Sequence, residues 1–201
     1  MLSTLKKIWV IIYRINFDPQ TEWELLKSES SSVSYHMKKI VMPVTLCISI
    51  ATFTGYFFAS GIYGYTFVYV CIRTISAFCE SFFPLYIAFL IIYEISPGMG
   101  LTAGRDNLFK LMTYSFSSFW LTSFIAGLLA NYKTLDEFLK YLGLFGMYLF
   151  WTGAESLLTF ENGRKIRFVL VSFGIILIIY SLIHWSFGYA LTIAHFPEIF
   201  N

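Results

Sequence analysis

Charged residues are scarce in this sequence. Asp, Glu, Lys and Arg make up 13% of the 201 residues, about half of the ~25% that is typical of soluble domains. The formal net charge is only +2, and the basic residues are scattered, which argues against nucleic-acid binding. Because 57% of the residues are hydrophobic, the composition excludes an ordinary soluble domain and predicts a membrane protein.

Patterns that would bind a metal or form disulfides are also missing. The three cysteines, Cys47, Cys71 and Cys79, lie inside hydrophobic runs, and no Cys-x-x-Cys or Cys/His spacing typical of a zinc site is present. His184 has no His, Asp or Glu within four residues on either side. We therefore expect no disulfide framework, no metal site and no cofactor.

The residue combinations that catalysis needs are not recognisable either. The glycine-rich stretch from Ser96 to Asp106 lacks the Gly-Lys-Ser/Thr ending of a phosphate-binding loop and is interpreted as a flexible turn. No nucleophile–base pair and no paired-carboxylate pattern is present. We predict that the protein is not an enzyme and has no catalytic residues.

Long hydrophobic runs dominate what is present. A helix needs about 20 apolar residues to cross a bilayer, and five runs approach or exceed this length. They predict transmembrane helices at 40–60, 66–94, 109–130, 138–158 and 167–191. The predicted fold is all-α: a polytopic integral membrane protein with one five-helix bundle over 35–201, preceded by a cytoplasmic segment over 1–34.

The distribution of Lys and Arg predicts the orientation in the membrane. When alternate loops are grouped, eleven of these residues fall on the side of the N-terminus and two on the other side. Because cytoplasmic loops are enriched in Lys and Arg, the N-terminus is predicted to be cytoplasmic and the C-terminus external, periplasmic or lumenal. The basic side is expected to face an anionic membrane surface.

The first 15 residues predict an amphipathic helix in the membrane interface. Apolar residues recur at helical spacing and leave a basic opposite side. A second helix is expected to start at Asp18-Pro19. The residues predicted to anchor this segment at the interface are Trp9, Lys6, Lys7, Arg14 and Trp23. The alternatives are a helix packed on the cytoplasmic face of the bundle and a signal peptide, which the short apolar core disfavours.

The second hydrophobic run carries a polar stripe. Arg73, Ser76, Glu80 and Pro84 advance by three or four residues, so they share one helix face. A charge at bilayer depth costs about 2.5–3.5 kcal/mol on insertion scales and usually faces protein or water, so Glu80 is expected inside the bundle. Arg73 and Glu80 are about 10 Å apart along the axis, which predicts an intervening group such as Ser76 rather than a direct salt bridge.

Two further acids complete the predicted intramembrane cluster. Glu94 ends the second run, and Glu155 lies near the cytoplasmic end of the fourth run, where it is expected to meet Glu94 or Arg105. Hydroxyl groups of the third run could line a narrow polar path beside the stripe. The cluster is interpreted either as a proton or ion relay or lipid-headgroup pocket, or as a structural network that fixes helix register.

The chain also resembles a known family. Asn16-Phe17-Asp18-Pro19 is followed by Trp23 and Glu29, and Pro43 opens a first run that ends in Phe53-Thr54-Gly55. Together with Thr113-Tyr114-Ser115 and the stretch from Gly143 to Tyr148, this pattern resembles the Yip (Ypt-interacting protein) domain family, and its bacterial members in particular. The Asp-Leu-Tyr-Gly-Pro motif of eukaryotic members is absent, so GTPase binding is not carried over. A second departure is Ser118, which stands where a proline is expected after Tyr-Ser.

The resemblance implies a non-catalytic membrane adaptor or scaffold. Its expected partners are the lipid bilayer and a membrane protein or a second copy of the chain, and its expected location is a bacterial inner membrane. The alternative is a small transporter or channel-like subunit that uses Arg73 and Glu80. An adaptor predicts that Glu80 is sealed from water, whereas a transporter predicts a cavity that reaches it from one side.

Overall fold

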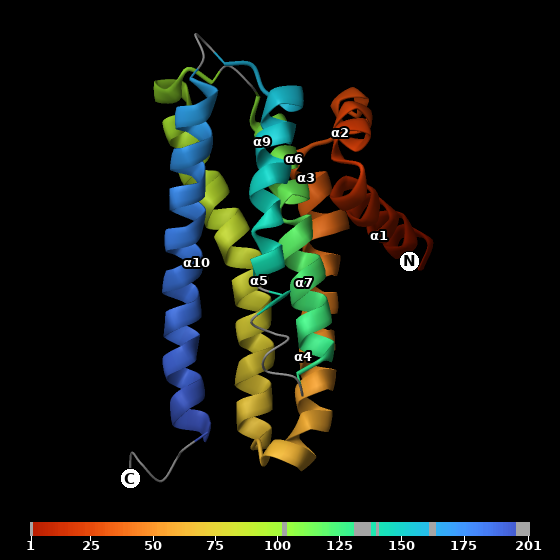
Figure 1. The fold of residues 1–201 in the computed structure, drawn as a ribbon, viewed down its shortest axis with the longest axis vertical. Coiled ribbons are helices and arrows are strands. Elements are labelled where there is room, and N and C mark those ends of the chain that lie inside the picture. The colour runs from red at the N-terminus through yellow and green to blue at the C-terminus, as the bar shows by residue number, and fades with distance from the viewer. Residues whose placement is uncertain (1, 102–103, 131–137, 140, 161–163, 196–201) are drawn as a thin grey trace.

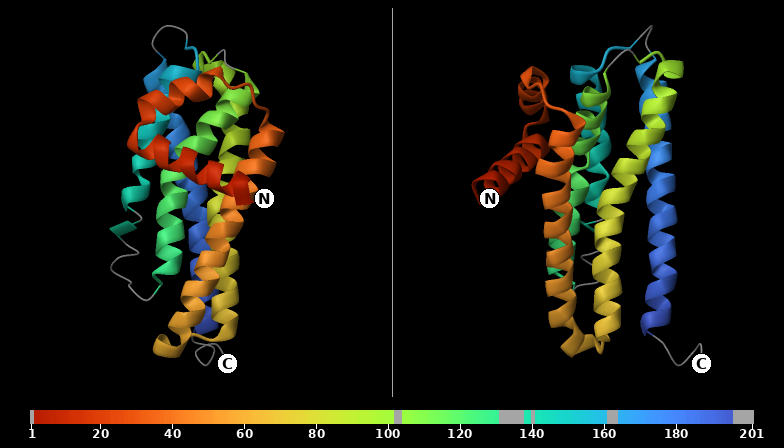
Figure 2. Two further views of the ribbon diagram at one scale, coloured as in Figure 1. Left: turned by 90° about the vertical axis from the view of Figure 1, so that its right-hand side faces the viewer. Right: turned by 180° about the vertical axis from the view of Figure 1, so that it is seen from behind.

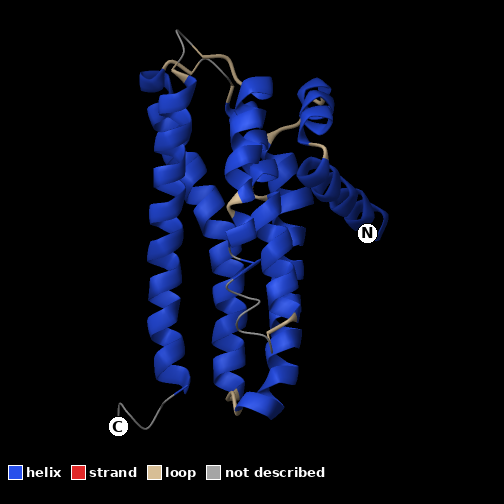
Figure 3. Cartoon of the chain, viewed as in Figure 1, coloured by secondary structure: helices blue, strands red, loops and turns tan. Residues whose placement is uncertain are grey.

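The computed structural model describes the backbone of residues 2–101, 104–130, 138–139, 141–160 and 164–195, and the side chains from 8 to 193 within these ranges. Helices make up nearly all of the described chain (Figure 3). In order they are α1 Leu2–Phe17, α2 Pro19–Ser28, α3 Val33–His36, the π-helical turn Met37–Val41, α4 Met42–Tyr63, α5 Phe67–Ile95, the 3-10 turn Ser96–Met99, α6 Arg105–Ser115, α7 Ser117–Leu128, α9 Phe145–Leu157 and α10 Lys165–His195. The all-α prediction is confirmed for these residues, where the only β feature is an isolated bridge between Leu101 and Phe160.

Within the described part of the chain, three helices are long and apolar enough to cross a membrane. They cover Val33–Tyr63, Phe67–Met99 and Lys165–Ile193, and they run side by side along the whole molecule (Figure 1). Gly64 has a φ of 68°, a left-handed conformation that glycine adopts without steric cost and that ends α4. The short turn therefore sends α5 back beside α4, and α5, which contains Pro84, bends along its length as a helix with an internal proline does.

The third and fourth predicted spans are interrupted, so the structure does not contain five continuous membrane-spanning helices among the residues it describes. The third is divided at Phe116 into α6 and α7. Beside this point, the Ser117 hydroxyl accepts from the Asn16 side chain and the Ser118 hydroxyl donates to the carbonyl oxygen of Leu142. In the fourth, α9 has only 13 residues, about 20 Å of helix against a hydrocarbon core of ~30 Å. The structure therefore contains three helices of spanning length and two interrupted segments between α5 and α10.

Close backbone contact holds α7 against α4. A Cβ atom added to Gly55 of α4 would lie 1.9 Å from the carbonyl oxygen of Gly127 in α7. Only glycine permits such an approach, which is typical of helix pairs in membranes. On the other side of α5, α10 packs mainly against α5 and forms one flank of the bundle (Figure 1).

The N-terminal helices pack on the bundle. In Figure 2, α1 and α2 cross the face formed by α6, α7 and α9. Ile8, Ile12 and Ile15 of α1 are buried, and the ring of Trp9 lies 5.2 Å from that of Phe124 in α7. The apolar side of α1 therefore contacts protein, as in the alternative of a helix packed on the bundle, and does not face the bilayer as predicted.

Candidate functional site

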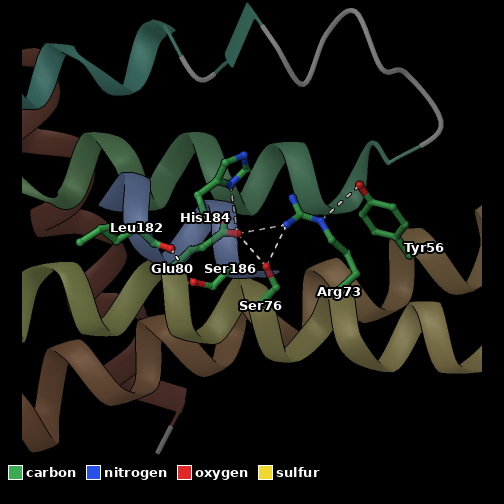
Figure 4. A network of polar contacts seen from close by, with 7 residues as sticks. All are labelled: Tyr56, Arg73, Ser76, Glu80, Leu182, His184 and Ser186. Carbon is green, nitrogen blue, oxygen red and sulfur yellow. Dashed lines mark hydrogen bonds and ion pairs between the residues drawn. The ribbon is translucent and has the colours of Figure 1, made fainter. Parts of the chain in front are cut away.

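The polar stripe of α5 forms a connected network (Figure 4). The Ser76 hydroxyl donates to Glu80 Oε1 at 2.7 Å, and Arg73 Nη1 donates to Ser76 Oγ at 3.3 Å. Arg73 Nη1 also lies 3.5 Å from Glu80 Oε1, so the expectation that no direct salt bridge forms is wrong. Both side chains are long enough to extend along the helix axis, which closes the ~10 Å between their backbones.

Neighbouring helices complete the network from both sides. On α4, the Tyr56 hydroxyl accepts from Arg73 Nε at 3.4 Å, and the Tyr56 ring lies 5.6 Å from the guanidinium carbon. On α10, His184 Nδ1 lies 3.2 Å from Glu80 Oε1. Residues from three helices therefore converge on one carboxylate and its arginine.

Sequence reasoning missed His184. Its position near Trp185 indicated an interfacial ring, and its acidic partner lies 104 residues away in the chain. Comparing the depths of the two residues in the membrane could have paired them. Glu80 lies about 21 Å from Glu94 along α5, and His184 lies about 26 Å from Arg167 along α10. Since Glu94 and Arg167 were both expected at the cytoplasmic surface, the acid and the histidine were expected at similar depth.

Burial and pairing define the electrostatics of the site. The side chains of Arg73 and Glu80 are 15% and 9% exposed, whereas that of His184 is 46% exposed. The arginine and carboxylate charges cancel, and the carboxylate also receives hydrogen bonds, which offsets the cost of placing an acid at bilayer depth. As expected, Glu80 faces the inside of the bundle.

A small polar cavity lies beside this network. Its volume is about 40 Å³, and it is lined by Arg73, Glu80, Thr122 and Ser123, among others. Such a space holds only a few waters, since a cavity needs about 10–15 Å³ to hold one water. Of the hydroxyl groups of the third run, only Thr122 and Ser123 reach this cavity among the residues that the structure describes.

Glu94 and Glu155 do not join the network. Glu94 is exposed at the end of α5. Glu155 Oε2 accepts from Lys165 Nζ at 2.8 Å, and Arg105 lies over the rings of Phe89 and Tyr93 at 5.7 and 5.6 Å. The expected contact of Glu155 with Glu94 or Arg105 is therefore replaced by a surface pair with Lys165.

No family model, curated protein or solved structure matches this chain.

The predicted interfacial anchors lie in different environments. Trp23 is fully buried against Gly153 of α9, where an added Cβ would come within 2.5 Å of the indole ring. Trp9 is half-buried and Arg14 is exposed, whereas the side chains of Lys6 and Lys7 lie outside the described residues. Trp23 therefore fixes α2 to the bundle and has no access to lipid.

A second polar arrangement, which sequence reasoning also missed, lies on α6. Lys110 is buried, and its Nζ donates to the carbonyl oxygen of Leu26 at 2.8 Å and to that of Glu29. One turn earlier, Asp106 Oδ1 accepts from the backbone N–H of Val33 at 2.8 Å. A cation thus binds the C-terminal end of α2 and an anion the N-terminal end of α3, the pairing that helix dipoles favour.

In the sequence analysis, Lys110 served only as one of the basic residues counted in the loops. Its spacing of four residues from Asp106 would have placed both side chains on one face of a helix. The partners of both residues are backbone atoms, so no side-chain pattern identified them. Among the described residues, no group of three His, Cys, Asp or Glu side chains is placed to hold a metal ion.

Proposed function

We propose that this protein is a non-catalytic adaptor or scaffold of the membrane, of the type that the Yip-domain resemblance implies. Its partner is another membrane protein or a second copy of the chain. The proposal places the N-terminus in the cytoplasm, the C-terminus on the external side, and the chain in a bacterial inner membrane. It includes no GTPase binding and no catalytic step.

The proposal rests on the burial of Glu80 and on the contacts of its carboxylate with protein groups. The Glu80 residue is 7% exposed, its carboxylate contacts Arg73, Ser76 and His184, and the adjoining cavity has a volume of about 40 Å³. The carboxylate is thus occupied by protein groups and has little contact with open space. The network is therefore better suited to joining α4, α5 and α10 than to carrying a solute.

The outer face of α10 is the proposed docking surface. Only 22% of the most apolar 18-residue stretch of α10 is buried, against 50% for the corresponding stretch of each of the other two long helices. Its outward side chains include Ile178, Leu182 and Trp185. In lipid, a partner helix would bind such a face through van der Waals packing, and the network behind it keeps α10 in register.

Site-specific cross-linking in native membranes tests this proposal. A photoreactive phenylalanine analogue at position 178 or 182 is expected to give one defined protein adduct, identified by mass spectrometry. An adduct of twice the chain mass identifies a second copy. The same analogue in place of Phe58, which is exposed on α4, is the matched control. Protein adducts at neither α10 position, or equal adducts at all three positions, would contradict the proposal.

A small transporter remains the second candidate because of one observation. The cavity beside Glu80 brings the hydroxyl groups of Thr122 and Ser123 to the Arg73–Glu80 pair, which is the start of the polar path expected from the sequence. Reconstituted vesicles would then take up protons or small ions, and Glu80→Gln would abolish the uptake. Glu155→Gln, which removes an exposed carboxylate outside the network, is the control.

A further inference from the structure

A second, larger cavity lies between α10, α9 and the junction of α6 with α7. Its volume is about 240 Å³, many times the ~10–15 Å³ that a cavity needs to hold one water. Apart from Ser115, Tyr180 and His184, its lining consists of apolar side chains, proline and glycine. Protein interiors contain few voids larger than one water, so a cavity of this size requires an explanation.

The cavity opens towards the surface that faces hydrocarbon. Leu144, Met147 and Leu177 line it and are themselves exposed on the outside of the bundle. In a membrane, these exposed apolar side chains contact acyl chains. The cavity is therefore continuous with the lipid-facing surface of α9 and α10.

The cavity lies well inside the membrane. On α10 it extends from Phe173 to His184, about 16 Å of helix. His184 contacts Glu80, which lies about midway along α5, ~20 Å from Phe67 and ~21 Å from Glu94. Since the hydrocarbon core is ~30 Å thick, the cavity lies at a depth where only protein and acyl chains are present.

The interrupted helices form the inner wall of the cavity. Ser115 and Phe116 mark the break between α6 and α7, and Gly143 and Gly146 lie at the start of α9. Irregular backbone at membrane depth occurs where it is buried in protein or lines a cavity. An added Cβ on Gly146 would lie 2.7 Å from the Ser115 carbonyl oxygen, so α9 and the α6–α7 junction meet closely and close the cavity on this side.

We propose that this cavity binds one acyl chain of a membrane lipid. The chain enters past Leu177 and extends towards Phe173. The site is independent of the protein partner proposed above.

Photolabelling of the full chain in vesicles tests the site. The probe is a phosphatidylcholine with a diazirine near the end of one acyl chain, diluted into phosphatidylcholine vesicles. After irradiation, adducts are expected on the inward-facing residues from Phe173 to Ile176 and on α9 around Phe150. Leu177→Trp narrows the entrance and is expected to lower this labelling at least fivefold. Leu170→Trp, also exposed on α10 but outside the cavity lining, is expected to leave it unchanged.

Two results would overturn the proposal. Adducts confined to outward residues such as Leu182 would show that lipid only surrounds the bundle. Equal labelling of Leu177→Trp and Leu170→Trp, with both variants eluting as the folded chain in gel filtration, would show that the entrance plays no part.

Ser115 provides an independent test of whether the occupant of the cavity is an acyl chain. Its Oγ is buried and has no hydrogen-bond partner among the described atoms, and it lies in the cavity wall. An acyl chain offers no partner, so Ser115→Ala is expected to retain the labelling within twofold. A fivefold loss in the folded variant would show that the native occupant carries an oxygen at this point, and would overturn the assignment of an acyl chain.

Discussion

At the scale of single residues, the Arg73–Glu80 pair illustrates how a charged group is retained at bilayer depth. Each charge alone would be costly, and each is held by the other and by polar groups from its own or a neighbouring helix. Removing one partner leaves the other buried and uncompensated, and this loss is larger than the net contribution of the intact pair.

Glu80→Gln is therefore expected to lower the free energy of unfolding by about 2–3 kcal/mol, because Arg73 loses its counter-charge. Unfolding in mixed micelles, followed by tryptophan fluorescence, measures the change. The matched control is Glu155→Gln, which removes an exposed carboxylate and should leave stability unchanged. Equal stability of Glu80→Gln and the native chain would contradict the structural role of the pair.

Glu22 of α2 predicts a pH dependence. Burial raises the pKa of Glu22 above its ordinary value of 4.5, partly countered by the charge of Arg14 and reinforced by that of Asp18. The folded state then binds the proton more tightly than the unfolded chain, so stability is lost as pH rises from 4.5 through the raised value.

Glu22→Gln should therefore increase stability at neutral pH by about 1 kcal/mol or less, and the gain should disappear towards pH 4. Unfolding curves between pH 4 and 8 measure it. The exposed neighbour Glu24 provides the control, since Glu24→Gln should show no such trend. A gain that is constant over the whole range would rule out the proposed titration.

At the scale of helices, two kinds of contact determine where the elements lie. Buried charges bind helix ends, as Lys110 does at the end of α2. Glycines allow backbones to touch, as Gly55 and Gly127 do between α4 and α7. The first contact holds the N-terminal helices on the bundle, and the second fixes α7 beside α4.

Lys110→Met is expected to loosen α2, because the carbonyl groups of Leu26 and Glu29 lose their buried donor. Each unsatisfied carbonyl costs about 1–3 kcal/mol. Faster hydrogen exchange in 19–29, with the exchange of α4 and α5 unchanged, is the expected readout. Lys27→Met, at an exposed position of α2, is the control. Unchanged exchange in Lys110→Met would contradict the role of this lysine.

Gly55→Ala is expected to destabilise the bundle by about 1–3 kcal/mol, because its methyl group would collide with the α7 backbone. Gly61 offers the matched control: it lies in the same helix with no atom within 4 Å of an added Cβ, so Gly61→Ala should be neutral or slightly stabilising. Thermal unfolding of both variants measures the difference. A Gly61→Ala variant that is less stable than Gly55→Ala would contradict the close contact between α4 and α7.

The sequence was sufficient for the helical class and for the three long apolar helices, because continuous hydrophobicity over 20 or more residues is a local property. It was not sufficient for the breaks at Phe116 and before Phe145, because no proline or charged residue stands at either point. Likewise, the helical spacing of Arg73, Ser76 and Glu80 identified three of the five residues of the network, whereas His184 and Tyr56 reach it only through the packing of α10 and α4.

At the scale of the whole molecule, the three long helices are compatible with an integral membrane protein. In Figure 1, α6 and α7 lead away from the end of the bundle that holds the start of α10, and α9 leads back towards it. The start of α4 and the end of α10 therefore lie towards opposite ends of the bundle. The cytoplasmic N-terminus and external C-terminus remain a prediction from the distribution of Lys and Arg.

The central claim is that the Glu80 carboxylate is closed off from water inside the bundle, and thiol accessibility tests it most directly. Ser123 lines the small cavity beside Glu80, so Ser123→Cys, in a chain whose three native cysteines are replaced by serine, reports on water at the network. Gly61→Cys and Gly98→Cys, at exposed positions near opposite ends of the bundle, are the controls. With a membrane-impermeant maleimide, each control should be labelled from one side, and Ser123→Cys should resist labelling from both. Labelling of Ser123→Cys from either side would reveal an aqueous path to Glu80 and contradict the account.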